Sequence, residues 1–128
     1  MPSKLLFTYG TLMRGYGLHR LLAPAHFVAR GRVRGELLNL GPYPGLVDGR
    51  GTVRGELYEI DDPKLLRAID RAEGYNFERR STLVTLADGR RRRAWLYEYT
   101  GPRGRAVPIP EGDYRRVTPG GPDGAHRR

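Results

Sequence analysis

The residue best placed to transfer a proton is Glu73, near the end of the segment "DDPKLLRAIDRAEGY". The apolar residues of this segment form one helical stripe, which consists of Leu65, Leu66, Ile69 and Ala72. Glu73 follows Ile69 by four residues, so on a helix it lies on or beside the stripe that faces the core. A helix C-terminus also disfavours negative charge. A carboxyl in such a place has a raised pKa, which suits a group that accepts and donates protons in turn.

A structural role for Glu73 is the alternative interpretation. Arg79 or Arg80 could pair with its carboxylate, and a tight pair would keep the carboxylate ionised and unsuited to acid–base catalysis. The side chain could also turn into water at the end of the helix. Asp70, three residues earlier, is interpreted as a structural or solvated residue.

The segment "FTYGTL", residues 7–12, is the second candidate for chemistry. An apolar strand ends there at Gly10, and a glycine permits both a tight turn and the close approach of a ligand. The break can direct the N–H groups of Gly10, Thr11 and Leu12 at one spot, where they would stabilise a negatively charged oxygen. A plain turn between a strand and a helix is the alternative.

Side chains near these motifs are further candidates. Tyr43 and Pro44, in the segment "GPYPG", either line a pocket or belong only to a stiff loop. Arg14 either attracts a substrate carboxylate or is solvated. His19 fits packing or the surface better than catalysis, and Tyr75 either lines the site or packs at the helix end.

The elements that must position these residues are mostly strands. Asp61 or Asp62 caps the start of the predicted central helix, Pro63 suits its first position and Gly74 suits the position after its end. A short helix is predicted over residues 18–23. The predicted strands cover residues 4–9, 27–40, 52–60, 79–86 and 92–99, by their apolar alternation and turn signals.

The chain after Thr100 is rich in Gly, Pro and Arg. Val107, Ile109 and Tyr114 are its predicted anchors in the core. Residues 118–128 are predicted to be a disordered tail, because they offer no apolar side chain of any size to bury.

The length and composition of the chain exclude several classes of protein. A chain of 128 residues suits one domain with a sizeable core. It has no cysteine, which excludes disulfides, thiol catalysis and thiolate metal sites. No apolar run approaches the roughly 18 residues of a membrane span, and no secretion signal follows the N-terminus. A cytoplasmic location is therefore expected.

The net charge of +9 raises the alternative of an RNA-binding domain. Such a domain gathers basic residues on one face and adds aromatic rings for stacking on bases. Here the arginines are scattered along the chain, so nucleic acid is not the expected partner. The one dense run, Arg90–Arg93, follows an "ADG" turn signal and is interpreted as the solvated start of an edge strand.

Four motifs in a fixed order resemble the gamma-glutamylcyclotransferase-like family. They are "FTYGTL", then "YPGLV" at residues 43–47, "VRGELYEI" at 53–60 and "AIDRAEGY" at 68–75. "GDYR", at residues 112–115, resembles the C-terminal element of the branch that contains gamma-glutamylamine cyclotransferase and short bacterial members. The resemblance implies an α+β fold over residues 1–117, a small barrel-like mixed sheet with short flanking helices.

The resemblance also implies a reaction, in which a gamma-glutamyl amide cyclises to 5-oxoproline and releases an amine. Glu73 matches the acid–base of the family, and Tyr9, Gly10, Thr11 and Leu12 match its substrate-binding loop. Tyr43 is added as a pocket wall. Because the substrate supplies both its own nucleophile and its own carbonyl, no metal or cofactor is expected.

The sequence does not identify the amine that is released, and it does not give the oligomeric state. The glutathione-linked branch has asparagine where this chain has Leu12, which favours the gamma-glutamylamine branch. A non-catalytic member of the same fold that binds a small ligand is the alternative from another class of protein.

Overall fold

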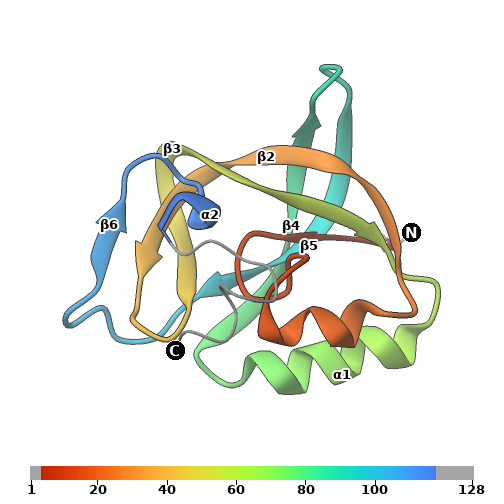
Figure 1. Cartoon of the computed structure of the whole chain (residues 1–128), viewed down its shortest axis with the longest axis horizontal. Coiled ribbons are helices and arrows are strands. Elements are labelled where there is room, and N and C mark those ends of the chain that lie inside the picture. Colours follow the sequence, from red (N-terminus) through yellow and green to blue (C-terminus); the bar gives the residue numbers. More distant parts are fainter. Residues whose placement is uncertain (1–3, 118–128) are drawn as a thin grey trace.

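Five strands close into a barrel (Figure 1). β1 (Leu5–Thr8) lies between β3 (Pro44–Glu59), to which it is antiparallel, and β5 (Arg91–Tyr99), to which it is parallel. β4 (Phe77–Leu86) pairs with β5 and with β2 (His26–Asn39), and β2 pairs with β3 to complete the ring. The barrel-like sheet of the predicted α+β fold is thereby confirmed.

The computed structural model describes residues 4–117. The predicted tail, residues 118–128, lies outside the described residues, as do residues 1–3. Near the end of the described chain, β6 (Val107–Ile109) pairs with the last residues of β2, and the short helix α2 (Tyr114–Val117) follows. No helix within the described part is long and apolar enough to cross a membrane.

Two apolar clusters fill the barrel and the space between the barrel and its helices. The first includes Phe7, Val53, Leu57, Val84 and Leu96. The second includes Leu6, Leu22, Tyr58, Ile69 and Tyr97. Successive residues of β1 therefore contribute to different clusters. Burial on both faces explains why β1 is an unbroken apolar run rather than an alternating one.

The central helix, α1 (Pro63–Glu73), begins and ends where the sequence predicts. The Asp62 carboxylate accepts a hydrogen bond from the Lys64 N–H at 2.9 Å, which caps the first turn. Gly74 has a φ of 80°, and its N–H donates to the Asp70 carbonyl at 3.3 Å. The predicted short helix is a 3₁₀ helix, η1 (Gly17–Leu22), and leucines of both helices pack in the second cluster.

The strand boundaries differ from the predicted ones at the β2–β3 hairpin. β3 begins at Pro44 rather than Thr52, so Pro44 and Gly45 belong to a strand and not to a loop. The turn-like segment "DGRG", residues 48–51, stays extended because β3 pairs with β2 on both sides of a bulge near Gly35.

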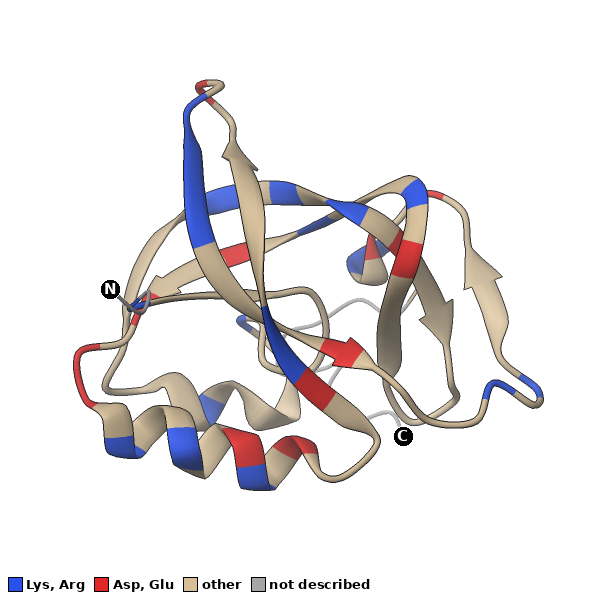
Figure 2. Ribbon diagram, turned by 180° about the vertical axis from the view of Figure 1, so that it is seen from behind, with Lys and Arg blue, Asp and Glu red and all other residues tan. Residues whose placement is uncertain are grey.

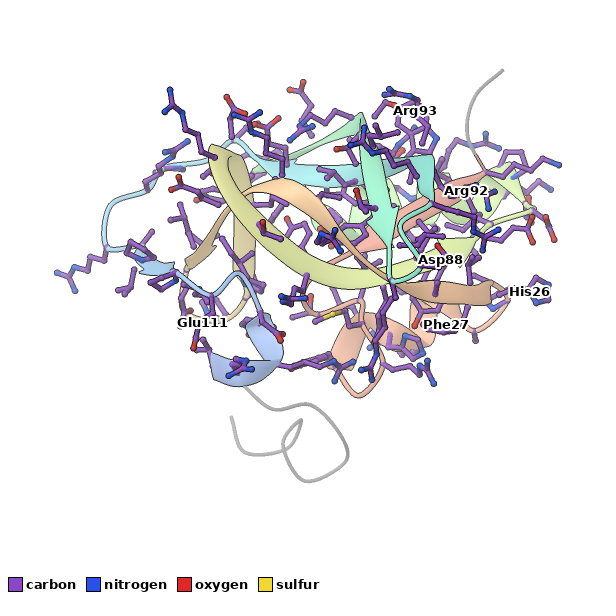
Figure 3. The ribbon with its side chains drawn as sticks, turned by 90° about the horizontal axis from the view of Figure 1, so that it is seen from above. His26, Phe27, Asp88, Arg92, Arg93 and Glu111 are labelled. Carbon is purple, nitrogen blue, oxygen red and sulfur yellow. The ribbon has the colours of Figure 1, made fainter. Side chains whose placement is uncertain are left out.

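Two smaller predictions also need correction. Val107 was predicted to anchor the C-terminal segment, but it is 60% exposed, whereas Ile109 and Tyr114 are buried. The arginine run was predicted to start an edge strand. β5 is instead an inner strand of the barrel, and only its first residues are exposed, because they extend with β4 in a projecting hairpin (Figure 1). Figure 3 shows Arg92 and Arg93 on the outer surface of this hairpin.

Candidate active site

One pocket, of about 270 Å³, brings the predicted site residues together. It lies where the loop after β1 meets the start of β3, the C-terminal end of α1 and the end of β5. All six predicted site residues line it, namely Tyr9, Gly10, Thr11, Leu12, Tyr43 and Glu73. The pocket is also lined by Phe7, Thr8, Leu18, Pro44, Ala72, Phe77 and Tyr97. Side chains distant in the sequence thus form one small, mostly apolar cavity.

Close packing fixes the end of β1 and the loop that follows it. Gly55 of β3 has no room for a side chain, because a Cβ atom there would collide with the Thr8 carbonyl oxygen and lie 2.6 Å from Phe7. At Gly10 a Cβ atom would lie 2.5 Å from the ring of Pro44. Glycine at residue 10 is therefore required by contact with β3 and not by an unusual backbone conformation.

The loop itself keeps its N–H groups available. Its carbonyl groups are engaged: Gly10 accepts from the Met13 N–H at 2.9 Å, and Thr11 accepts from the Leu18 N–H at 3.1 Å. Within residues 4–117, no hydrogen bond is donated by the N–H groups of Gly10, Thr11 or Leu12. Three unused donors beside one cavity are an arrangement suited to a carboxylate or an oxyanion.

Tyr9 braces the floor of the pocket. Its hydroxyl donates to the Tyr97 carbonyl at 2.5 Å and accepts from the Leu46 N–H at 3.2 Å. Burial raises the pKa of this hydroxyl far above its ordinary value, so the group stays neutral. Because both hydrogen bonds are made within the protein, Tyr9 offers a ligand its ring and its backbone rather than its hydroxyl.

Glu73, the last residue of α1, is half-buried at the edge of the same cavity. Burial raises the pKa of its carboxyl to about 7. In the described part of the chain, its carboxylate makes no hydrogen bond and no ion pair. A carboxyl with this pKa is present in both protonation states near neutral pH, as an acid–base catalyst requires.

The pairing of Glu73 with an arginine, considered from the sequence, is wrong. Arg79 instead binds Asp70 with two hydrogen bonds, of 2.9 and 3.2 Å, and Asp70 also accepts from the Tyr97 hydroxyl at 2.6 Å. Arg80 binds Glu98 at 2.8 Å. Asp70 is therefore structural, as predicted, and it holds the arginine that could have neutralised Glu73.

Some of the further candidate residues line the pocket and others lie outside it. Tyr43 lines the pocket and packs on Phe77, with ring centroids 5.7 Å apart, and Pro44 lies beside it. Arg14 is outside the pocket lining, with its guanidinium 4.2 Å from the ring centroid of Phe27. Tyr75 is 94% exposed and does not line the pocket.

His19 has a packing role, as the sequence favoured. Its Nδ1 lies 2.9 Å from the Leu12 carbonyl oxygen, and its ring packs against Tyr58. Sequence reasoning missed Phe77 and Tyr97 as lining residues. The only signal was their aromatic character, because strand pairing decides which faces of β4 and β5 border the cavity.

The sequence is similar to known proteins of one family. The family described as "Gamma-glutamyl cyclotransferase, AIG2-like" matches residues 6–116. The gamma-glutamylcyclotransferase family protein YtfP of Escherichia coli (strain K12) is 34% identical over 112 residues, which cover 85% of this chain and 94% of that protein. The gamma-L-glutamyl-butirosin B gamma-glutamyl cyclotransferase of Niallia circulans is 39% identical over 77 residues, which cover 59% of this chain and 47% of that enzyme.

The solved structures agree with the fold. The crystal structure of an uncharacterized protein from Pyrococcus horikoshii superposes with a TM-score of 0.73 at 28% identity, over 90% of this chain and 92% of that one. Both the family match and the fold therefore span nearly all of the described residues. The chain belongs to the gamma-glutamyl cyclotransferase, AIG2-like family, and is an enzyme of the type that its motifs predicted.

Proposed function

We propose that this protein cyclises a gamma-glutamyl amide to 5-oxoproline and releases the amine, with Glu73 as the general acid and base. One observation supports this proposal above the others. A carboxyl with a pKa of about 7 and no partner in the described chain shares a small cavity with three unused N–H donors.

The first step is the transfer of a proton from the α-ammonium group of the substrate to the Glu73 carboxylate. The free amine then attacks the γ-carbonyl carbon, and a C–N bond forms within the same molecule. The carbonyl electron pair moves to the oxygen, which becomes an oxyanion. The N–H groups of Gly10, Thr11 and Leu12 are the donors available to stabilise it.

The second step breaks the bond between the γ-carbon and the leaving nitrogen. As the oxyanion collapses to a carbonyl, Glu73 returns its proton to the leaving nitrogen, which departs as an amine. The ring nitrogen still carries two protons after the attack, so it gives one to the Glu73 carboxylate, which passes it to the released amine; the products are 5-oxoproline and an ammonium ion. One carboxyl can perform both transfers because its pKa lies between those of a free glutamate and an amine. The protein contributes no nucleophile, and the reaction balances without a metal or cofactor.

Positioning supplies much of the proposed rate acceleration. A substrate folded so that its amine faces its own carbonyl reacts as an oriented intramolecular pair, an effect that can supply about 7–11 kcal/mol in ideal cases. Tyr43, Phe77 and Leu18 provide apolar walls that favour a folded substrate over an extended one. The described residues that line the cavity include no lysine, arginine or histidine, so the substrate carboxylate would also depend on the loop N–H groups.

The family and Leu12 support an expectation about the substrate class. The relative from Niallia circulans is named for a gamma-glutamyl compound, gamma-L-glutamyl-butirosin B. Leu12 replaces the asparagine of the glutathione-linked branch with an apolar wall. We therefore expect the substrate to be a gamma-glutamyl amine rather than a gamma-glutamyl amino acid. We also expect the reaction to take place in the cytoplasm.

A screen of gamma-glutamyl compounds tests the proposal. The panel should contain gamma-glutamyl amino acids, gamma-glutamyl alkylamines and gamma-glutamyl polyamines, each with its α-glutamyl isomer as a control. We expect 5-oxoproline and free amine in equal amounts from at least one alkylamine or polyamine, and no amine from the α-isomers. Tight binding of a compound without its turnover would favour a non-catalytic ligand-binding protein instead.

A further inference from the structure

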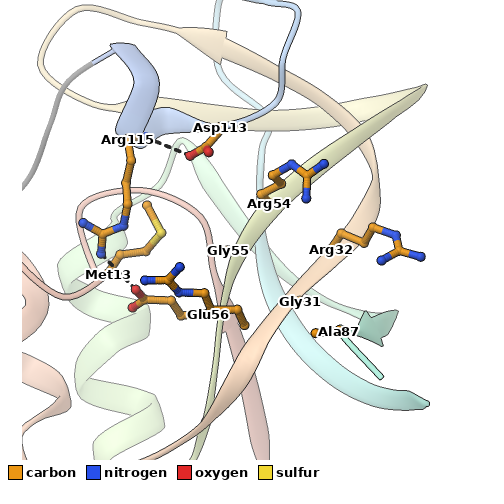
Figure 4. Close-up of a pocket in the computed structure, with 10 residues that line it drawn as sticks. Met13, Gly31, Arg32, Arg54, Gly55, Glu56, Ala87, Asp113 and Arg115 are labelled. Carbon is orange, nitrogen blue, oxygen red and sulfur yellow. Dashed lines mark hydrogen bonds and ion pairs between the residues drawn. The ribbon is translucent and has the colours of Figure 1, made fainter. Parts of the chain in front are cut away.

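A second pocket, of about 200 Å³, lies on the outer face of the β2–β3 ribbon and shares no lining residue with the first (Figure 4). Four arginines line it, together with two carboxylates. Among residues 4–117, the lining consists of Met13, Arg30, Gly31, Arg32, Arg54, Gly55, Glu56, Ala87, Asp113 and Arg115. Nothing in the proposed cyclisation uses this pocket.

Both carboxylates of the second pocket are already engaged. Glu56 is buried, and its oxygens accept from the Arg14 N–H at 3.0 Å, the Tyr58 hydroxyl at 2.8 Å and the Arg115 guanidinium at 2.9 Å. Asp113 accepts from the backbone N–H of Arg115 at 3.1 Å. Figure 4 shows Arg115 reaching from α2 to Glu56 on one side of the pocket. One of the four arginines is therefore neutralised.

The side chains of the other three arginines, Arg30, Arg32 and Arg54, make no hydrogen bond and no ion pair within residues 4–117. Arg32 of β2 lies directly opposite Arg54 of β3 in the strand register. Side chains of directly opposed residues lie on the same face of an antiparallel pair, so the two positive charges are neighbours. Figure 4 shows both side chains projecting to the same side of the ribbon.

The same face continues with further positive charge. Arg30, Arg32 and Arg34 alternate along β2 and are exposed, so they share one face, and Figure 2 shows this row of basic positions on the strand. Like charges placed directly opposite each other destabilise a sheet. An anion bound between the arginines would remove this repulsion.

We propose that this pocket binds a small molecule that carries two or more phosphate groups. The planar guanidinium group presents paired N–H donors that match phosphate oxygens, and several guanidinium groups around one hollow favour several phosphates. The lining residues within 4–117 offer no aromatic ring on which a base could stack, and the pocket is small. Both features favour a small oligophosphate over single-stranded RNA.

Calorimetric titration of the full chain with pyrophosphate, tripolyphosphate and inorganic phosphate tests the proposal. We expect affinity to rise with the number of phosphates and to fall as salt rises. Changing Arg32→Gln together with Arg54→Gln should weaken tripolyphosphate binding by about ten-fold or more, because both charge-assisted contacts are lost. Removing two repelling charges should leave the fold intact, as a thermal melt would show.

The matched control is Arg103→Gln with Arg105→Gln, which lowers the net charge equally in an exposed segment outside both pockets. Tripolyphosphate affinity should change less than about two-fold in this control. Equal losses in the two double variants would contradict the proposal, since attraction by net charge would then explain the binding. Tighter binding of a short single-stranded oligonucleotide than of tripolyphosphate, through the same two arginines, would also contradict it.

Discussion

Glu73 is a carboxyl without a partner among residues 4–117, and its environment makes the proposed chemistry depend on pH. Burial raises its pKa to about 7, so below that pH the group is protonated and cannot accept the ammonium proton. We expect kcat/KM to rise as the pH increases through about 7 and then to level. A pH–rate profile measured between pH 5 and pH 8 checks this. A limb centred near the ordinary glutamate pKa would mean that Glu73 is solvated in the free enzyme.

The same carboxyl has a consequence for stability. Its pKa is higher in the folded chain than in the unfolded chain, so the folded state binds more protons between pH 4.5 and 7 and loses stability as the pH rises through that window. Glu73→Gln should therefore be more stable than the parent at pH 8, and the difference should shrink toward pH 4.5. Urea unfolding at both pH values measures it. A less stable variant at pH 8 would indicate a structural role for the carboxylate.

Tyr9 shows how a residue can line a site and serve mainly to hold it. Tyr9→Phe removes both hydrogen bonds of the buried hydroxyl, and leaves the Tyr97 carbonyl and the Leu46 N–H without their partner. We expect a loss of about 1–3 kcal/mol in the free energy of unfolding. Tyr75→Phe, at an exposed ring, is the control and should change little. Equal stabilities for the two variants would contradict the bracing role.

At the scale of the elements, the contact between the β1 loop and the start of β3 shapes the site. Gly10→Ala would place a Cβ atom 2.5 Å from Pro44, so the loop would have to move and its N–H groups would turn from the cavity. We expect kcat/KM to fall by about ten-fold or more, as small displacements of donors do. Gly17→Ala is the matched control, because no atom lies within 4 Å of its Cβ position. Parent-like turnover by Gly10→Ala would show that the loop donors are not used.

Glu56 joins three elements, namely β3, the loop after β1 and α2. Burial alone would raise the pKa of its carboxyl, but the hydrogen bonds from the Arg14 N–H, Tyr58 and Arg115 outweigh burial and lower it. The ionised form therefore contributes stability above its ordinary pKa of 4.5, and this is lost as the pH falls through the lowered folded-state pKa.

Glu56→Gln should accordingly lower the free energy of unfolding at pH 7 by about 1–3 kcal/mol. At pH 3 the difference in this free energy between the variant and the parent should be smaller. Denaturant unfolding at the two pH values measures both effects. The exposed Glu59→Gln provides the control. A gap that stays constant with pH would show that the charge of Glu56 is not what joins the three elements.

At the scale of the whole molecule, local signals predicted the elements and the site better than the strand ends. The cap at Asp62 and the stop at Gly74 fix α1 by local chemistry, so its limits and the inward place of Glu73 follow from a few residues. The start of β3 does not follow from nearby residues, because pairing with β2 holds the "DGRG" segment extended. The partners of Arg79 and Arg80 depend on where β4 and β5 lie beside α1, which no local pattern encodes. The second pocket was missed for the same reason, since its arginines are scattered in sequence and meet only across strands.

The most direct test of the proposed function is the release of 5-oxoproline by Glu73→Gln, compared with the parent on the best substrate of the screen. Gln keeps nearly the same shape but cannot take a proton from the ammonium group. We expect kcat to fall by roughly a hundred- to ten-thousand-fold, with a folded variant in a thermal melt and with substrate affinity changed far less. Release of 5-oxoproline by the folded variant at the parent rate would contradict the assignment of Glu73 as the acid and base.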